Sequence, residues 1–330
     1  MNAASAGYLS ALALGEAQTH SNIVVFPLLG PDVGAAPYLT LAEALAAQCL
    51  KVTEVSESGS VPELKVVSNS DRPVLLLDGE ELVGAKQNRV LNTTILLKER
   101  AETRIPVTCV EQGRWAYASA SFAASEAVMS RKVRACKTRS VSESLTAGAH
   151  FMSDQSEVWQ EVAALQNSAG VASATGAMQD VFQARAADLE TCTRIFTPVT
   201  GQTGLFVVVD GEVAGFDIVA HADAYGKLRP KLLRSYLIDA LVEPKPRPAD
   251  AAQAATVAQA FLHEAGKSDE KPFASVGYGT DYRYQKPGLA GSALVHEDRI
   301  VHMAFFRLPK GESPDSTMAS LRHRRRRFTE

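Results

Sequence analysis

The feature that most constrains the fold is a run of five extended segments between about residues 51 and 110, with no helical pattern between them. The segments are KVTEV, ELKVVS, RPVLLLDG, RVLNTTILLK and TRIPVTCVEQ, and Gly, Ser, Pro and charged residues separate them. Parallel strands need long crossover connections, whereas antiparallel strands can be joined by short turns. The chain is therefore predicted to be an α+β protein with mostly antiparallel sheets of hairpins and several packed helices.

Helices are predicted where apolar residues recur at helical spacing or where a helix start is signalled. Thr40 and Glu43 have the spacing of a capping box ahead of an alanine-rich run. Pro230 stands where the first residue of a helix is expected, before KLLRSYLIDALV. The predicted helices cover residues 38–48, 154–166, 174–191, 231–242 and 251–265; further strands are predicted at residues 22–28, 194–198, 205–209, 213–219, 290–295 and 300–308. Residues 111–150 show no regular pattern.

Two segments of the chain repeat one another. VLLLDGEELVGA and FVVVDGEVAGFD both run from an apolar strand through Asp-Gly-Glu to a short segment with a glycine. Asp-Gly favours tight turns, so two hairpins with the same turn chemistry are expected, with an old duplication as the alternative.

The chain is predicted to hold one large domain. With 46% hydrophobic and 22% charged residues, it has the composition of a globular protein that can bury a core. Strands near both ends of the chain are needed to complete a sheet, which favours a single α+β domain over residues 20–308. Residues 1–20 are expected to form a flexible N-terminal arm or a short docking helix, and residues 309–330 a disordered basic tail.

The distribution of charge argues against a dedicated nucleic-acid-binding domain. The formal net charge is −3, yet five of the 34 basic residues lie in the last ten positions, LRHRRRRFTE. The rest of the chain is therefore more acidic than the total suggests, whereas a nucleic-acid-binding domain is normally basic along one face. The tail is expected to make at most screened, sequence-independent contacts with acidic surfaces.

A cytoplasmic location is predicted. No apolar run approaches the length of a membrane span, and no positively charged segment precedes Leu9–Leu14, as a signal peptide would require. The four cysteines are isolated, with no CxxC pair, which fits a reducing compartment.

One polar cluster carries the chemistry. If RVLNTTILL and RIPVTCV pair as antiparallel neighbours, the segment 87–89 lies close to the segment 111–115. The guanidinium of an arginine can donate two parallel hydrogen bonds to a carboxylate or a phosphate, and a tryptophan ring offers a face on which a planar group can stack. Carboxylates accept hydrogen bonds from hydroxyls or bind a divalent ion. The candidate ligand-binding residues are Asp78, Glu80, Glu81, Lys86, Gln87, Asn88, Arg89, Glu111, Gln112, Arg114 and Trp115. The alternatives are a buried structural network and a solvated surface turn.

Catalytic and metal-binding roles have weaker signals. Glu80 and Glu81 are candidates for a general base or metal ligands, and Cys109 is a candidate nucleophile, although a cysteine in an apolar strand is typically an inert core residue. A metal site at Asp217, His221 and Asp223 is the alternative to structural roles for these residues. A divalent metal ion is the cofactor that such carboxylates would hold. No GxSxG nucleophile elbow, Walker motif or GxGxxG is present.

The string LLLDGEELVGAKQNRVLNTTILL, followed by IPVTCVEQGRW, resembles the ARG-and-rhodanese-phosphatase-superfamily-associated protein domain. The resemblance extends through VWQEVA, SATGAMQDVF, DGEVAGFD, LLRSYLIDAL and GSALVHEDRIVHMAFF, and so covers most of residues 20–308. It implies one family-length domain in a prokaryotic protein. Gene association implies a role of the family in biological conflict or in nucleotide-linked contexts, and no catalytic residues are carried over.

The function expected from these observations is the binding, with or without processing, of a small phosphorylated or nucleotide-derived ligand. Arg89 and Arg114 would hold the anion, Trp115 would stack, and Glu80, Glu81 and Glu111 would accept from hydroxyls or hold a metal. The first alternative is a non-catalytic protein-interaction or scaffold module whose polar cluster is structural. The second is a metal-dependent hydrolase that uses the carboxylates. A small molecule is the expected partner, with a protein partner as the alternative; neither a membrane nor a specific nucleic acid is expected.

Overall fold

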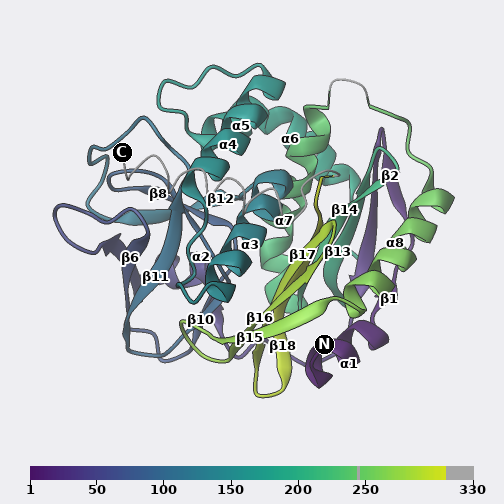
Figure 1. Ribbon diagram of the computed structural model, residues 1–330, viewed down its shortest axis with the longest axis horizontal. Helices are drawn as coiled ribbons and strands as arrows, with labels where there is room; N and C mark the ends of the chain where they lie inside the picture. Colours follow the sequence, from purple (N-terminus) through teal and green to yellow (C-terminus); the bar gives the residue numbers. More distant parts are fainter. Residues whose placement is uncertain (244–245, 310–330) are drawn as a thin grey trace, which may run out of the picture.

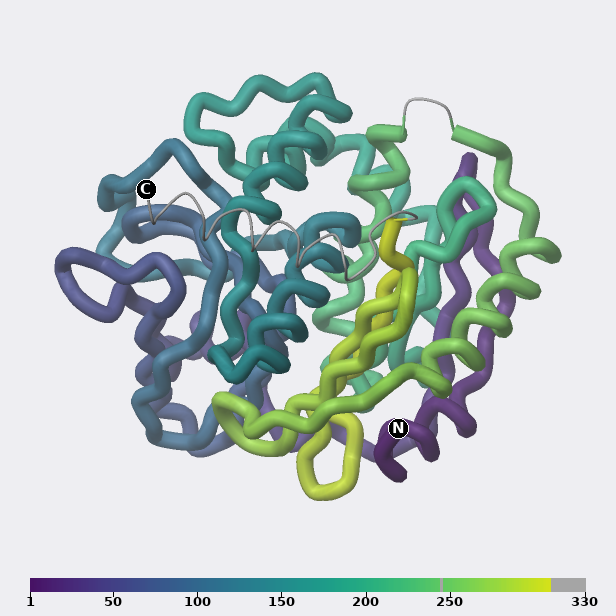
Figure 2. The backbone as a smooth tube through the Cα atoms, viewed as in Figure 1, coloured from purple at the N-terminus to yellow at the C-terminus, as the bar shows by residue number. Residues whose placement is uncertain are grey.

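A computed structural model describes residues 1–243 and 246–309, and its strands form mostly antiparallel sheets, as predicted. The larger sheet has the strand order β1-β3-β13-β14-β18-β17-β16-β15, with β2 also paired to β3 (Figure 1). Its strands are β1 (Ala13–Leu14), β2 (Gln18–His20), β3 (Ile23–Leu29), β13 (Gln202–Val209), β14 (Glu212–Val219), β15 (Asp269–Ala274), β16 (Thr280–Lys286), β17 (Leu289–His296) and β18 (Arg299–Arg307). The N-terminal strands, purple in Figure 2, therefore lie in one sheet with the C-terminal strands.

Both faces of the larger sheet are covered because its strands alternate between two apolar cores. Leu205 and Val207 of β13 belong to one core, and Phe206 and Val208 belong to the other. Helices cover each face, with α3 and α7 on the first and α1 and α8 on the second. The helices of the protein are α1 (Ala3–Ala11), α2 (Leu41–Ala46), α3 (Arg131–Thr146), α4 (Gln155–Ala169), α5 (Met178–Ala184), α6 (Ala186–Ile195), α7 (Ala222–Leu241) and α8 (Ala251–Gly266).

The extended segments in the first third of the chain build two smaller sheets. One has the order β12-β8-β9-β11-β6-β5 and the other β10-β7-β4, and a third apolar core that includes Leu82, Leu91 and Ile95 draws on both. The strands are β4 (Leu39–Thr40), β5 (Leu50–Glu54), β6 (Glu63–Ser68), β7 (Val74–Leu76), β8 (Glu80–Gly84), β9 (Arg89–Leu91), β10 (Ile95–Leu97), β11 (Glu102–Cys109) and β12 (Phe122–Val128). Among the strands of residues 1–243 and 246–309, only β4 and β7 pair in parallel.

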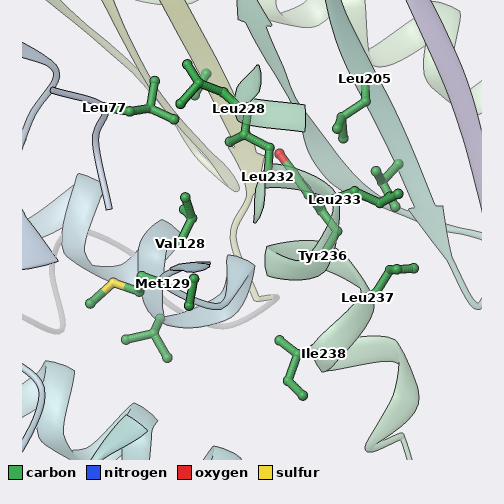
Figure 3. Close-up of a cluster of buried hydrophobic side chains, with 14 of the residues drawn as sticks. Leu77, Val128, Met129, Leu205, Leu228, Leu232, Leu233, Tyr236, Leu237 and Ile238 are labelled. Carbon is green, nitrogen blue, oxygen red and sulfur yellow. The ribbon is translucent and has the colours of Figure 1, made fainter. Parts of the chain in front are cut away.

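Helix α7 joins the two halves of the protein. Figure 3 shows its residues Leu228, Leu232 and Tyr236 between Leu205 of the larger sheet and Val128 of β12, with all of these side chains buried. Helix α3 lies beside it and contacts β16, β17 and β18. None of the helices in residues 1–243 and 246–309 is long and apolar enough to cross a membrane.

Several elements were predicted correctly from local signals. The capping box is present, because the Thr40 hydroxyl accepts from the Glu43 amide and the Glu43 carboxylate accepts from the Thr40 amide. Asp210-Gly211 forms the tight turn of the β13–β14 hairpin, with φ of 54° and 76°. The matching Asp78-Gly79 does not form a hairpin, because β7 and β8 belong to different sheets. The prediction of two like hairpins is therefore wrong for the first.

Other predictions need correction. Pro230 does not open a helix but lies inside α7, which begins eight residues earlier at Ala222. Residues 194–198 are the end of α6 and a coil, not a strand, and residues 111–150 contain β12 and α3.

Of the two expectations for the first twenty residues, a flexible arm or a short docking helix, the structure has the docking helix. Helix α1 docks on the larger sheet, because the Asn2 side chain donates to Glu270 (2.9 Å) and the Tyr284 hydroxyl donates to Ser5 (2.8 Å). Tyr8 is buried and bonds to Thr203. The predicted tail, apart from Pro309, lies outside the described residues.

Candidate functional site

The pairing of β9 with β11 brings the predicted cluster together. Cys109 lies opposite Arg89 in the antiparallel register, as the sequence indicated. The amide of Asn88 donates to Glu111 Oε2 (2.9 Å), and Gln87 Nε2 donates to the Glu111 carbonyl (3.0 Å). The long segment RVLNTTILL is divided in two, since β9 pairs with β11 and β10 pairs with β7. The predicted neighbourhood of residues 87–89 and 111–115 is therefore confirmed.

The guanidinium of Arg114 makes its hydrogen bonds to other residues of the chain. Its Nε and Nη2 donate to the two oxygens of Glu111, at 2.8 Å and 2.6 Å. Its Nη1 donates to the carbonyls of Ala85 (2.7 Å) and Ala116 (3.0 Å), and Nη2 also reaches Asn88 Oδ1 (3.1 Å). Burial alone would raise the pKa of Glu111, but the bond from Arg114 lowers it. Arg114 thus fastens the loop after β11 to the loop after β8.

Arg89 differs from Arg114 because most of its guanidinium has no partner. The side chain is completely buried, and only Nη1 makes a hydrogen bond, to Gln87 Oε1 (2.7 Å). Nε and Nη2 make no hydrogen bond of good geometry to the described residues, although the Cys109 thiol lies nearby. Burial lowers the pKa of Arg89, an effect that nearby Cys109 and Glu54 oppose. A buried guanidinium with two unsatisfied nitrogens is costly, so a counter-ion or acceptor at this place would stabilise the protein.

Two exposed aromatic rings lie beside Lys86, and one of them also lies beside Arg89. Trp115 is 47% exposed and Tyr117 53% exposed. Lys86 Nζ lies 5.3 Å from the centre of the Trp115 ring and 5.0 Å from that of Tyr117, and the Arg89 guanidinium lies 5.5 Å from the Trp115 ring. Such distances are those of cation–π contacts.

Glu54 completes this group. Its Oε1 accepts from the Lys86 amide (3.3 Å), whereas its Oε2 is buried and has no hydrogen-bond partner among the described residues. A Cβ placed on Gly59 would lie 3.4 Å from that oxygen and 3.3 Å from the Trp115 ring, so all these groups converge. We call Glu54, Lys86, Arg89, Trp115 and Tyr117 the Trp115 site. Glu54 and Tyr117 were not predicted from the sequence. The signal for Glu54 is the alternation of buried and exposed residues along β5, and the signal for Tyr117 is its position two residues after Trp115.

The acidic members of the predicted cluster point elsewhere. Glu80 Oε2 accepts from the Leu77 amide (2.6 Å), and Oε1 is paired with Lys231. Glu81 is buried on the opposite face of β8, and neither of its oxygens has a hydrogen bond of good geometry within the described residues. Burial raises the pKa of Glu81 to about 8; nearby Ser125 opposes the shift, and the charge of Glu111 reinforces it. Gln112 is exposed.

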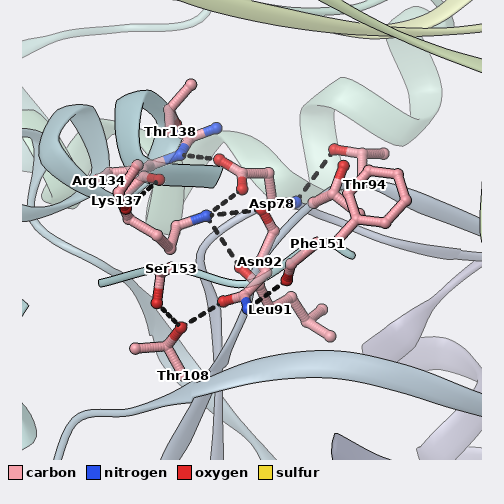
Figure 4. Close-up of polar contacts among 12 residues, drawn as sticks. Asp78, Leu91, Asn92, Thr94, Thr108, Arg134, Lys137, Thr138, Phe151 and Ser153 are labelled. Atoms are coloured by element: carbon pink, nitrogen blue, oxygen red, sulfur yellow. Dashed lines mark hydrogen bonds and ion pairs between the residues drawn. The ribbon is translucent and has the colours of Figure 1, made fainter. Parts of the chain in front are cut away.

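Asp78 belongs to a buried ionic network between the two halves of the protein (Figure 4). Arg134 of α3 donates through Nε to Asp78 (2.9 Å) and through Nη2 to Asp217 of β14 (2.6 Å). Lys137 is paired with Asp78 and donates to the carbonyls of Leu91 and Asn92, each at 3.1 Å. Arg134 and Lys137 have no exposed surface. The ionic network therefore connects the β7–β8 turn and the larger sheet through one helix.

The charges of the ionic network are well compensated. Burial would raise the pKa of Asp78 and Asp217, but Lys137 and Arg134 lower the first and Arg134 lowers the second. Burial lowers the pKa of Lys137 to about 8, against the pull of Asp78. Asp217 also accepts from the Tyr236 hydroxyl (2.7 Å) and contacts His302 Nε2 (3.1 Å). Because the charged side chains of the ionic network are paired with one another, we interpret it as a structural connection between the β7–β8 turn and the larger sheet.

The candidate metal ligands are not brought together. Asp217 faces Arg134, His221 Nδ1 contacts the carbonyl of Gly34 (3.0 Å), and Asp223 accepts from the Ala36 amide (3.1 Å). Across residues 1–243 and 246–309, no group of three His, Cys, Asp or Glu side chains is arranged to hold a metal ion. Cys109 is buried, and burial raises its pKa, which disfavours the thiolate.

Comparison with protein families gives one match. Residues 11–306 match the ARG and Rhodanese-Phosphatase-superfamily-associated Protein domain, ARPP-1. The chain belongs to the ARPP-1 family. The matched range contains every residue of the Trp115 site and of the ionic network, so both are parts of the ARPP-1 domain. The search of curated proteins and the search of solved structures give no significant match.

Proposed function

We propose that this ARPP-1 chain binds a small phosphorylated or nucleotide-derived ligand at the Trp115 site. The observation that carries the proposal is the buried guanidinium of Arg89 beneath the exposed ring of Trp115, since two of its nitrogens make no hydrogen bond of good geometry to the described residues. A phosphate would supply the missing acceptors and the counter-charge.

The neighbours of Arg89 fit the rest of such a ligand. Lys86 adds a second cation within the same site, and Trp115 and Tyr117 offer exposed faces on which a planar base can stack. Glu54 Oε2 can accept from a ribose hydroxyl or an amino group. Because Trp115 lies over Arg89, the phosphate reaches the guanidinium by displacing the indole. Binding therefore changes the surroundings of Trp115.

The setting of this function is also part of the proposal. The family resemblance implies a prokaryotic protein in nucleotide-linked or conflict-related contexts. All four cysteines are without disulfide bonds, which suits the cytoplasm.

The proposal is tested by melting curves with adenine and guanine mono-, di- and triphosphates. The wild-type protein should melt at a higher temperature with at least one of them, since a ligand at about 100 times its Kd adds about 2.7 kcal/mol. Arg89→Met should lose this shift, and Arg104→Met, which removes an exposed arginine of β11, should retain it. In a Trp159→Phe variant, Trp115 is the remaining one of the two tryptophans, and its fluorescence should respond to the same nucleotide. Equal shifts in Arg89→Met and wild type would contradict the assignment.

The second candidate is a non-catalytic interaction module with a structural polar cluster. The contacts of Arg114 favour it, because the guanidinium is bonded to Glu111 and to backbone carbonyls of two loops. In this case Arg114→Met should destabilise the protein by about 3–5 kcal/mol, because Glu111 loses its buried partner. If Arg89 instead binds the anion of a ligand, Arg89→Met removes an unsatisfied buried charge from the ligand-free protein. That protein should then be as stable as the wild type or more stable.

The metal-dependent hydrolase is not supported by the geometry. Glu80 is paired with Lys231, and Glu81 lies on the other face of the strand from Arg89.

A further inference from the structure

A cavity of about 410 Å³ lies away from the Trp115 site, between β12, β8 and the helices α5, α6 and α7. One wall is formed by Val83 and Ala124 of the strands, and the other by Phe182 and Leu189 of the helices. This volume is within the range of small-molecule sites, which are mostly apolar with a few polar groups that fix orientation.

Among the described residues that line this cavity, the cation is Arg234 of α7. Its Nε is fully buried and makes no hydrogen bond, and none of its nitrogens has a hydrogen bond or ion pair with the described residues. Its position differs from that of other arginines on nearby helices, since Arg194 is paired with Glu190 and Arg185 donates to the Ala169 carbonyl. An acceptor inside the cavity would satisfy Arg234.

The other polar residues that line the cavity are Ser125, Glu126, Gln179, Gln183 and Glu190. Glu126 is exposed, and Glu190, which is also exposed, is already paired with Arg194. Their charges are screened by solvent and repel an anion only weakly. Ser125 and Gln179 are uncharged and can donate or accept hydrogen bonds. A ligand whose anionic head meets Arg234 and whose apolar body lies between Phe182 and Val83 would use both kinds of surface.

We infer that this cavity is a second ligand site, which binds a small amphipathic carboxylate through Arg234. The carboxylate accepts from the Arg234 guanidinium, and an aliphatic or aromatic body fills the apolar space between the strands and α5–α6. This site is independent of the Trp115 site, because none of the residues that line it belongs to that site.

The inference is tested by titration calorimetry of the full chain with 3-phenylpropionate and with its neutral amide, 3-phenylpropanamide. The acid should bind saturably and the amide more weakly. Arg234→Met should weaken binding of the acid by about tenfold or more and bring it to the level of the amide, because a charge-assisted hydrogen bond is lost. Ala186→Trp, at an exposed position that lines the cavity, should block both probes without removing a buried side chain.

Two controls separate this site from others. Arg104→Met removes an arginine elsewhere on the surface and should leave the affinity unchanged, as should Arg89→Met in the Trp115 site. Unchanged affinity in Arg234→Met, equal affinity for acid and amide in the wild type, or no saturable binding of the acid would each overturn the inference. Loss of binding in Arg89→Met would overturn it as well, because the carboxylate would then bind at the Trp115 site.

Discussion

Replacement of Glu81 by glutamine should stabilise the protein increasingly as the pH rises. Burial raises the pKa of Glu81 from the usual 4.5 to about 8. Between these two values the carboxyl is protonated in the folded protein and ionised in the unfolded chain. The folded state therefore binds the additional proton, and its stability relative to the unfolded chain falls as the pH rises through this window.

The expected magnitude follows from this shift. Each pKa unit corresponds to about 1.36 kcal/mol, so the wild type should lose roughly 2–3 kcal/mol between pH 5 and pH 7 relative to Glu81→Gln. Glutamine has the same shape and no charge to desolvate. The pH-independent part of the difference, such as an unsatisfied amide, does not affect the comparison of the two pH values.

The measurement is urea denaturation of both proteins at pH 5, 6 and 7. Shifts of other titrating groups occur in both proteins and cancel in the difference. Glu126→Gln, which removes an exposed carboxylate of the neighbouring strand β12, is the matched control and should not reproduce the effect of Glu81→Gln, because no buried charge is removed. If the difference between wild type and Glu81→Gln stays constant over this range, Glu81 is not a buried protonated acid and the reasoning is refuted.

Two further substitutions test the architecture. Arg134→Met should destabilise the protein by about 3–5 kcal/mol, because Asp78 and Asp217 lose their shared buried cation; a loss below about 1 kcal/mol in urea denaturation would contradict the assigned role of the ionic network. Pro230→Ala should stabilise the protein by up to about 3 kcal/mol, because exposed Pro230 inside α7 cannot donate to the carbonyl of Gly226, whereas alanine can. An unchanged melting temperature would show that α7 already compensates for the proline.

The sequence predicted those parts of the fold that depend on local signals. The capping box at Thr40 and the turn at Asp210 work through neighbouring residues, so a reading of the chain finds them. The contact between Arg89 and Cys109 was also predictable, because two apolar segments on either side of a short charged turn favour an antiparallel pair; the structure keeps only the β9 part of that pairing, since β10 pairs with β7.

Helix α3 was missed because its buried surface is polar. Its sequence, RKVRACKTRSVSESLT, lacks the apolar stripe of a core helix, yet Arg134, Lys137 and Ser142 have no exposed surface. The burial of α3 depends on tertiary contacts, because it packs against carboxylates from distant parts of the chain, and the local sequence of the helix does not show them. Asp217 within the apolar strand Glu212–Val219 was the available signal, because a buried carboxylate requires a cation.

The candidate site was predicted as one cluster, and the structure divides it. Sequence proximity grouped Asp78, Glu81 and Arg89, but β8 alternates its side chains between two faces, and the turn before it connects two different sheets. The division therefore depends on which strands pair with β7 and β8, and this cannot be read from the spacing of the charges.

The shared use of Arg134 by two aspartates has an evolutionary consequence. A single replacement of Arg134, Lys137, Asp78 or Asp217 leaves the ionic network with an uncompensated buried charge, and such an intermediate is strongly disfavoured. Apolar residues of similar size at all four positions could nevertheless be tolerated, because exchanging a complete buried ion group for well-packed apolar side chains is often neutral or stabilising. The four positions should therefore change together or not at all, and the four-residue variant should be more stable than any of the single variants.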